Sequence, residues 1–196
     1  FNLLGIEPSS TAKYAVEQGI NTENEFFSYD YSTKLNSKYG QAKIITTTNV
    51  FAHIENIRDF TKGIKNFLHA DGVFVIEFPY LQNMLEEKFF DIIYHEHLSY
   101  LSITPLNKLF GDFELNIFNI KRVNVGASGP GLRIFISHAN SKFEKKNVVN
   151  DFIEYENKNK YKSLNTYANF AKDVFKIRDE IDDLIKKLSS EKNKIG

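Results

Sequence analysis

The chain contains no cysteine among its 196 residues, and this absence excludes disulfide bridges and zinc sites built from thiolates. It also has no excess of either charge. The 25 Lys and Arg residues balance 25 Asp and Glu residues, so the formal net charge is +0. Because nucleic-acid-binding proteins usually carry a basic excess, we expect no nucleic-acid partner.

Long hydrophobic runs are missing as well. Apolar runs such as residues 72–76 are far shorter than the roughly 20 residues that a membrane-spanning helix needs. No basic and then apolar signal segment opens the chain. We therefore expect a cytoplasmic protein with no membrane partner, and its length is sufficient to bury a hydrophobic core.

Strand and helix patterns alternate along the first 80 residues. Strands are expected where β-branched and aromatic residues gather, and helices where apolar residues recur every three or four positions. The expected strands are residues 2–7, 25–29, 42–50 and 73–78, and the expected helices are residues 12–18, 31–39 and 54–69. This alternation predicts an α/β fold with a parallel sheet covered by helices on both faces.

The pattern changes after Pro79. We expect a short helix at residues 104–110, followed by two strands at 113–123 and 131–137 around a glycine-rich loop. From residue 147 onward the chain is polar with an apolar stripe, which predicts one or two long helices leading to a second module. Because strand-like residues stand at both ends, we interpret both ends as cuts through structure.

Several polar residues follow expected strands, where parallel α/β sheets bind their ligands. Glu7, followed by Pro8, ends the first strand, and its carboxylate can hold the two hydroxyls of a ribose or simply face solvent. Asn49 follows the third clear strand, with Val50 and His53 close behind. We expect these five residues to contact a cofactor, although helix capping would equally explain Asn49.

The segment Tyr94-His95-Glu96-His97 places several proton-handling groups side by side. Histidine can act as a general base near neutral pH, a carboxylate can orient it, and tyrosine can donate to a developing enolate oxygen. An extended segment would put His95 and His97 on one face, whereas a turn would let all four side chains converge. We interpret the four as catalytic, against the alternative of a structural cluster bonded to backbone.

A metal site is an alternative for the same residues. His95 and His97 could bind zinc or iron if His53 or His138 supplied a third ligand. We rank this below the general-base interpretation. Cupin-like metal sites lie in all-β barrels, whereas the alternation of strands and helices in the first 80 residues predicts an α/β fold.

A glycine-rich loop at residues 126–131 includes Ser128 and is followed by Arg133. Backbone N–H groups and a guanidinium can hold a diphosphate, although a hairpin turn would also favour glycine. We expect Ser128 and Arg133, with Tyr80 at the end of the last apolar strand, to contact substrate.

Five stretches together resemble the sugar C-methyltransferase family, which includes NDP-hexose 3-C-methyltransferases. The likeness covers most of residues 1–140, and the YHEH stretch is its most specific part. The stretches are GIEPSS with AKYAVEQGI at 5–20, TNVFAHI at 48–54, DGVFVIEFPYL at 71–81, FDIIYHEHLSYLS at 90–102 and GASGPGLRIFIS at 126–137.

The resemblance implies a class I S-adenosylmethionine (SAM)-dependent methyltransferase sheet, Rossmann-like, truncated at the N-terminus and followed by a helical C-terminal extension. Residues 1–140 would be a partial SAM-dependent domain, and residues 141–196 a helical linker into a missing C-terminal Rossmann-like domain. The family's Cys-rich zinc module and glycine-rich SAM loop are absent from this stretch, so zinc is expected only in a missing N-terminal module. Thr48 stands where the family often has Asn.

The resemblance also implies an activity. A family member methylates a carbon next to a ketone on a nucleotide-linked deoxysugar, with SAM as methyl donor. Carried onto this sequence, Glu7 would hold the cofactor ribose, His97 would remove the proton beside the ketone, and Tyr94 and Glu96 would support it. A non-catalytic fragment or assembly module is the remaining alternative.

Overall fold

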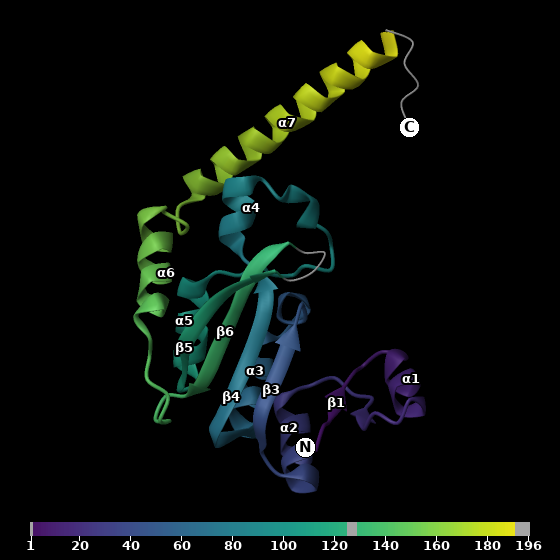
Figure 1. The fold of residues 1–196 in the computed structure, drawn as a ribbon, viewed down its shortest axis with the longest axis vertical. Coiled ribbons are helices and arrows are strands. Elements are labelled where there is room, and N and C mark those ends of the chain that lie inside the picture. Colours follow the sequence, from purple (N-terminus) through teal and green to yellow (C-terminus); the bar gives the residue numbers. More distant parts are fainter. Residues whose placement is uncertain (1, 125–128, 191–196) are drawn as a thin grey trace.

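The computed structural model describes residues 2–124 and 129–190 (Figure 1). The strands are β1 (Gly5–Ile6), β2 (Thr22–Glu23), β3 (Ala42–Thr48), β4 (Leu68–Pro79), β5 (Leu115–Asn124) and β6 (Pro130–His138). The α-helices are α1 (Thr11–Glu17), α2 (Tyr29–Tyr39), α3 (Ile57–Phe67), α4 (Leu81–Glu87), α5 (Ile103–Asp112), α6 (Asn147–Lys158) and α7 (Leu164–Ser190). Two short 3-10 helices are η1 (Phe51–His53) and η2 (Phe90–Ile92).

The strands form two sheets. The larger sheet has the order β3-β4-β6-β5, whereas β1 and β2 form a separate parallel pair. Strand β4 runs parallel to β3 and antiparallel to β6, and β6 runs antiparallel to β5. The sheet is therefore mixed, and the expected parallel pairing is confirmed only for β3 with β4 and for β1 with β2. The connection between β5 and β6 is too short for a parallel crossover, so these strands form a hairpin.

One expected strand does not form, and another begins earlier than expected. No strand forms at residues 25–29; the second strand is β2, and Ser28 caps α2 by accepting a hydrogen bond from Tyr31 N at 3.1 Å. Strand β4 starts at Leu68 rather than at residue 73, so Gly72 lies inside the strand. A Cβ atom at Gly72 would stand 2.9 Å from the carbonyl oxygen of His69, so glycine allows this close backbone approach.

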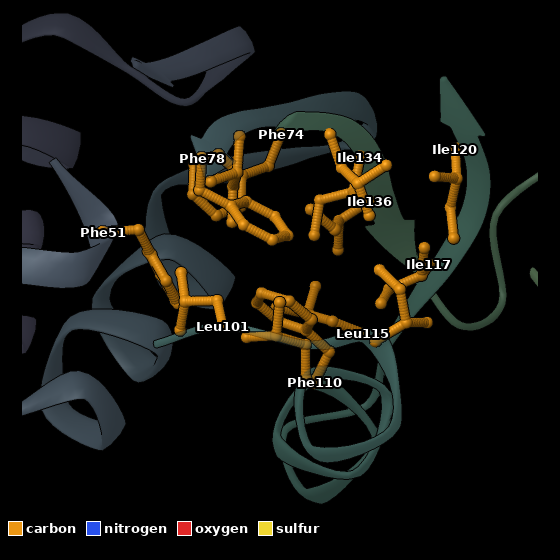
Figure 2. Packing of buried hydrophobic residues seen from close by; sticks show 14 of the residues in the cluster. Phe51, Phe74, Phe78, Leu101, Phe110, Leu115, Ile117, Ile120, Ile134 and Ile136 are labelled. Atoms are coloured by element: carbon orange, nitrogen blue, oxygen red, sulfur yellow. The ribbon is translucent and has the colours of Figure 1, made fainter. Parts of the chain in front are cut away.

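The hydrophobic core lies on one face of the larger sheet. Alternate residues of β4 point into it, and Phe74, Ile76 and Phe78 are fully buried. They pack with Ile134 of β6 and with Phe110 of α5, as Figure 2 shows. Helices α3, α5 and α6 also contribute buried side chains to this core.

The opposite face of the sheet is less covered. Val73, Val75 and Glu77 of β4 are only partly buried, and Ile44 of β3 keeps 68% of its surface exposed. Within residues 2–124 and 129–190, the expected covering of both faces by helices is thus not observed.

Long helices follow β6, as predicted. Helix α7 runs for 27 residues and extends away from the sheet (Figure 1). Its first turns contact α4, where Phe170 packs with Met84 and Leu85. Among the described residues, no helix combines the length and apolar character needed to cross a membrane.

Glu23 links the small sheet to α2. Its carboxylate accepts hydrogen bonds from Lys38 Nζ at 2.7 Å, Tyr31 Oη at 2.9 Å and Tyr39 Oη. The hydrogen bond from Lys38, followed by those from the two tyrosines, lowers the pKa of Glu23 to about 2. The charged carboxylate is therefore the form that holds β2 against α2.

We predict that Ile76→Ala lowers the free energy of unfolding by about 2 to 5 kcal/mol, because it leaves a cavity in a fully buried site. The matched control Ile44→Ala removes the same atoms from an exposed site on the neighbouring strand, and should change it by less than about 0.5 kcal/mol. Urea unfolding measures both values. Equal losses for the two variants would contradict the described core.

We predict that Glu23 makes stability depend on acid. Its pKa is depressed in the folded state, so its contribution is present above the unfolded pKa near 4.5 and is lost as pH falls toward about 2. Glu23→Gln should lower stability at pH 7 and weaken the pH dependence between about 5 and 2. Thermal unfolding at a series of pH values tests this, with exposed Glu154→Gln as the control.

Candidate active site

The Tyr94–His97 turn lies in the segment of residues 80–101, which leaves the sheet at the end of β4. Tyr80 and Leu101 form a parallel bridge at the base of this segment. Farther out, the N–H groups of Leu98 and Ser99 donate to the carbonyl oxygen of Ala52 at 3.0 and 3.2 Å. Since Ala52 lies in η1, directly after β3, the turn is held beside the carboxyl ends of β3 and β4.

The turn conformation, one of the two left open by the sequence, is the one observed. His97 N donates to Tyr94 O at 3.1 Å, which closes the chain on itself. The ring centroids of Tyr94 and His97 are 4.1 Å apart, and Tyr94 Oη lies 3.0 Å from His97 Nε2. The turn therefore places a phenol and an imidazole in direct hydrogen-bond contact.

The backbone fixes the tautomer of His97. Its Nδ1 lies 2.7 Å from the carbonyl oxygen of Ile92, which can only accept a hydrogen bond. Nδ1 therefore carries the hydrogen. In the neutral ring Nε2 is the acceptor, so Tyr94 Oη donates to it.

His53 lies against the same turn. Its Nδ1–H donates to the carbonyl oxygen of Glu96 at 2.8 Å, and its ring centroid is 4.9 Å from that of His97. The structure thus places this expected cofactor residue beside the expected base. Asn49 and Val50 precede it, and Asn49 N donates to Glu77 O at 3.0 Å across the ends of β3 and β4.

The four side chains of the turn do not all converge. His95 and Glu96 are exposed, and in the part of the chain that the structure describes their side chains form no hydrogen bond or ion pair. Tyr94 is 44% exposed and His97 is half-buried. The chemically paired groups are thus Tyr94 and His97.

A small pocket adjoins His97. Its volume is about 10 Å³, room for about one water molecule. Apolar side chains form most of its wall, which consists of Ala52, Pro79, Leu81, Met84, Ile92, His97, Ser99 and Tyr100. Burial raises the pKa of Tyr100, so this phenol stays protonated.

Two contributors to the turn were missed by the sequence reasoning. The carbonyl oxygens of Ala52 and Ile92 anchor the backbone of the turn and the ring of His97. Every residue type carries such a carbonyl, so no sequence pattern marks them.

Glu7 and Pro8 follow β1, which belongs to the other sheet. Glu7 Oε1 accepts a hydrogen bond from Ser9 N at 2.8 Å, and hydrogen bonds from the Ser9 side chain and backbone lower the pKa of Glu7. The carboxylate is therefore ionised at neutral pH. Among the described residues, no hydrogen bond or ion pair joins Glu7 or Pro8 to Val50 or His53.

Two of the expected substrate residues, Tyr80 and Arg133, each have a partner within the fold. Tyr80 is 1% exposed and donates its hydroxyl hydrogen to Glu156 at 2.8 Å, which argues against the predicted substrate contact. Arg133 pairs with Glu77 across β4 and β6. Ser128 lies outside the described residues.

The alternative set of metal ligands is not assembled. His138 Nε2 lies 2.9 Å from the carbonyl oxygen of Leu68, at the start of β4, whereas His53 and His97 lie beyond the end of β3. Within residues 2–124 and 129–190, no three His, Asp or Glu side chains form a group that could hold a metal ion.

Comparisons with known proteins find similarity to methyltransferases. A family model described as the C-methyltransferase C-terminal domain matches residues 126–196. The chain is 28% identical over 185 residues to C-methyltransferase NovU from Streptomyces niveus. The match covers 94% of this chain but 44% of that relative, so the chain spans less than half the relative's length.

Solved structures show the fold. A SAM-dependent methyltransferase from Anabaena variabilis superimposes with a TM-score of 0.52 at 14% identity, covering 69% of this chain and 67% of that one. Another, from Clostridium acetobutylicum, gives a TM-score of 0.51 at 11% identity, covering 71% and 76%. The fold is that of the class I SAM-dependent methyltransferases, as predicted. The family-model match and the similarity to NovU support the predicted resemblance to sugar C-methyltransferases.

Proposed function

We propose that the protein carrying this chain is a SAM-dependent C-methyltransferase. It removes a proton from the carbon next to a ketone on a nucleotide-linked deoxysugar and methylates that carbon. The observation that carries the proposal is the 3.0 Å contact between Tyr94 Oη and His97 Nε2 beside the ends of β3 and β4. The family match and the similarity to NovU support the same reaction class.

The paired groups suit this chemistry. A proton beside a ketone is acidic because the charge left on the carbon spreads onto the ketone oxygen. Its removal needs a base at the carbon and a donor at the nearby oxygen. His97 Nε2 takes the proton, and the Tyr94 hydroxyl turns from the imidazole to donate to the ketone oxygen as charge develops there.

The backbone supports His97 in this role. Once Nε2 binds the proton, the ring is a cation whose Nδ1–H still donates to Ile92 O. Hydrogen bonds from charged donors are about twice as strong as neutral ones, so this carbonyl stabilises the protonated ring. The His53–Glu96 hydrogen bond holds the turn while this happens.

The residues at the strand ends fit SAM. When bound, SAM supplies a methyl group on a sulfonium, whose sulfur leaves as a neutral thioether. Glu7 offers an ionised carboxylate as acceptor for the ribose hydroxyls. Asn49 and Val50, the latter 47% exposed, are the proposed contacts of the cofactor beyond β3.

We also propose that residues 1–140 form part of the SAM-dependent domain and that residues 141–196 lead to a further domain. The 44% coverage of NovU supports this organisation. The outer edge of β3 supports it too, because in the described parts of the chain no strand pairs with that edge. Edges of this kind are usually paired or covered, and a parallel strand between β1 and β3 would join the two sheets.

We predict that His97→Asn lowers the rate of methyl transfer by about 10²- to 10⁴-fold, the usual contribution of a general base. SAM binding, measured by calorimetry, should change by less than about two-fold, since the residue acts on the substrate. His95→Asn is the matched control and should retain most activity, because His95 is exposed. Unchanged turnover in His97→Asn would remove His97 from the mechanism.

We predict that Tyr94→Phe alters one nitrogen of His97 and not the other. The ¹⁵N shift of Nε2 should move because it loses the donated hydrogen bond, whereas Nδ1 keeps its partner Ile92 O. Histidine-labelled NMR spectra at a pH where the ring is neutral measure both nitrogens. Tyr100→Phe, whose ring centroid lies 6.1 Å from that of His97, is the control. A spectrum with hydrogen on Nε2 of the unmodified protein would contradict the tautomer.

A further inference from the structure

We propose that Glu156 is a positioning residue for the Tyr94–His97 turn, although it touches neither residue. It acts by tying together the two ends of the segment that carries the turn, residues 80–101. The proposal rests on the function proposed above, because that function assigns the proton transfer to this turn.

Glu156 is a buried carboxylate with three donors around it. It lies on α6 and is 2% exposed. Its Oε1 accepts hydrogen bonds from Tyr80 Oη at 2.8 Å and from Ile103 N at 2.6 Å, and its Oε2 accepts from Thr104 N at 2.8 Å. The chain leaves β4 at Tyr80 and enters α5 at Ile103. One carboxylate therefore binds both the residue at which the segment leaves β4 (its exit end) and the residue at which it enters α5 (its return end).

The return end needs this carboxylate. The first N–H groups of a helix have no partner within the helix and attract negative charge. Ser102 stands at the N-cap of α5, but its side chain makes no capping hydrogen bond. Glu156, from a different helix, supplies the missing acceptor for two of these N–H groups.

The exit end is held in the same place. Tyr80 bridges Leu101, and Leu81 N donates to Leu101 O at 3.0 Å. His97 lies four residues before Leu101 in the sequence. A shift at this base therefore moves the backbone that leads directly to the imidazole.

Helices α6 and α7 also hold the first part of the segment, α4. Glu86 Oε1 accepts hydrogen bonds from Tyr155 Oη at 2.7 Å and Tyr161 Oη at 2.8 Å. Lys88 Nζ forms an ion pair with Asp173 at 2.7 Å. Residues 80–101 are thus supported by the helical region 147–190 as well as by the sheet.

The sequence carries a signal for Glu156. Val149, Phe152 and Ile153 form the apolar stripe of α6 and pack on the core. Glu156 takes the next position of the i, i+3, i+4, i+7 pattern, where an apolar residue is expected. A carboxylate at such a position stays buried only if donors surround it.

Three variants test the proposal. Glu156→Gln keeps the shape but has one acceptor oxygen in place of two, so at least one of the three donors loses its partner. Tyr80→Phe removes only the tie to the exit and leaves α5 capped, which covers the case in which Glu156→Gln fails to fold. Glu154→Gln makes the same change on the same helix at an exposed position and is the matched control.

We expect Glu156→Gln and Tyr80→Phe to lower kcat by about ten-fold or more, because misplacement of a catalytic group is costly. KM for SAM should stay within about two-fold, since Glu7, the proposed ribose ligand, follows β1 of the other sheet. The ¹⁵N shifts of His97 should move in both variants and stay fixed in Glu154→Gln.

Folded Tyr80→Phe protein with unchanged kcat and unchanged His97 shifts would overturn the proposal. A fall in kcat that merely follows the folded fraction, with the His97 shifts fixed, would overturn it as well and leave a structural role. If the unmodified protein transfers no methyl group, the proposed function fails, and the His97 shifts still report whether Glu156 positions the turn.

Discussion

Strand β4 is the constraint on which both the core and the candidate site depend. Its inner side chains, Phe74, Ile76 and Phe78, are fully buried, and burial of each such side chain is worth about 1.5 to 3 kcal/mol. Its carboxyl end receives the hydrogen bond from Asn49 N at Glu77 O and releases the chain at Tyr80. The strand that supplies these three buried side chains is therefore also the one that sets where the segment with the Tyr94–His97 turn begins.

The turn itself is held largely by backbone carbonyls and by one remote carboxylate. Ala52 O fixes its far side, Ile92 O fixes the imidazole, and Glu156 closes its base. Reactive groups on loops need rigid supports if they are to keep a productive geometry. Here the sheet end and the helical extension both contact the segment that carries the turn, through Ala52 O and through Glu156.

Local patterns predicted the elements well where neighbouring residues decide them. Apolar spacing predicted α3, and the two strands predicted on either side of the glycine-rich loop are β5 and β6, which form a hairpin. The insertion of β6 beside β4 was not predicted, because pairing between distant strands depends on which edge remains open. Of the proposed site, the pairing of Tyr94 with His97 needed the turn, and the sequence allowed an extended strand equally. The burial of Tyr80 was missed because its partner, Glu156, lies 76 residues away.

The strand order has a consequence for synthesis of the chain. Strand β4 pairs with β6, with Phe74 opposite Ile136. Strand β6 begins 51 positions after the end of β4. At about 5 to 20 residues per second, a ribosome needs about 3 to 10 seconds to make that stretch. During this time the apolar side chains of β4 have left the ribosome, but the edge of β4 that pairs with β6 has no partner strand yet. Nascent chains therefore pass through a state with this edge open, which is the kind of surface that chaperones recognise.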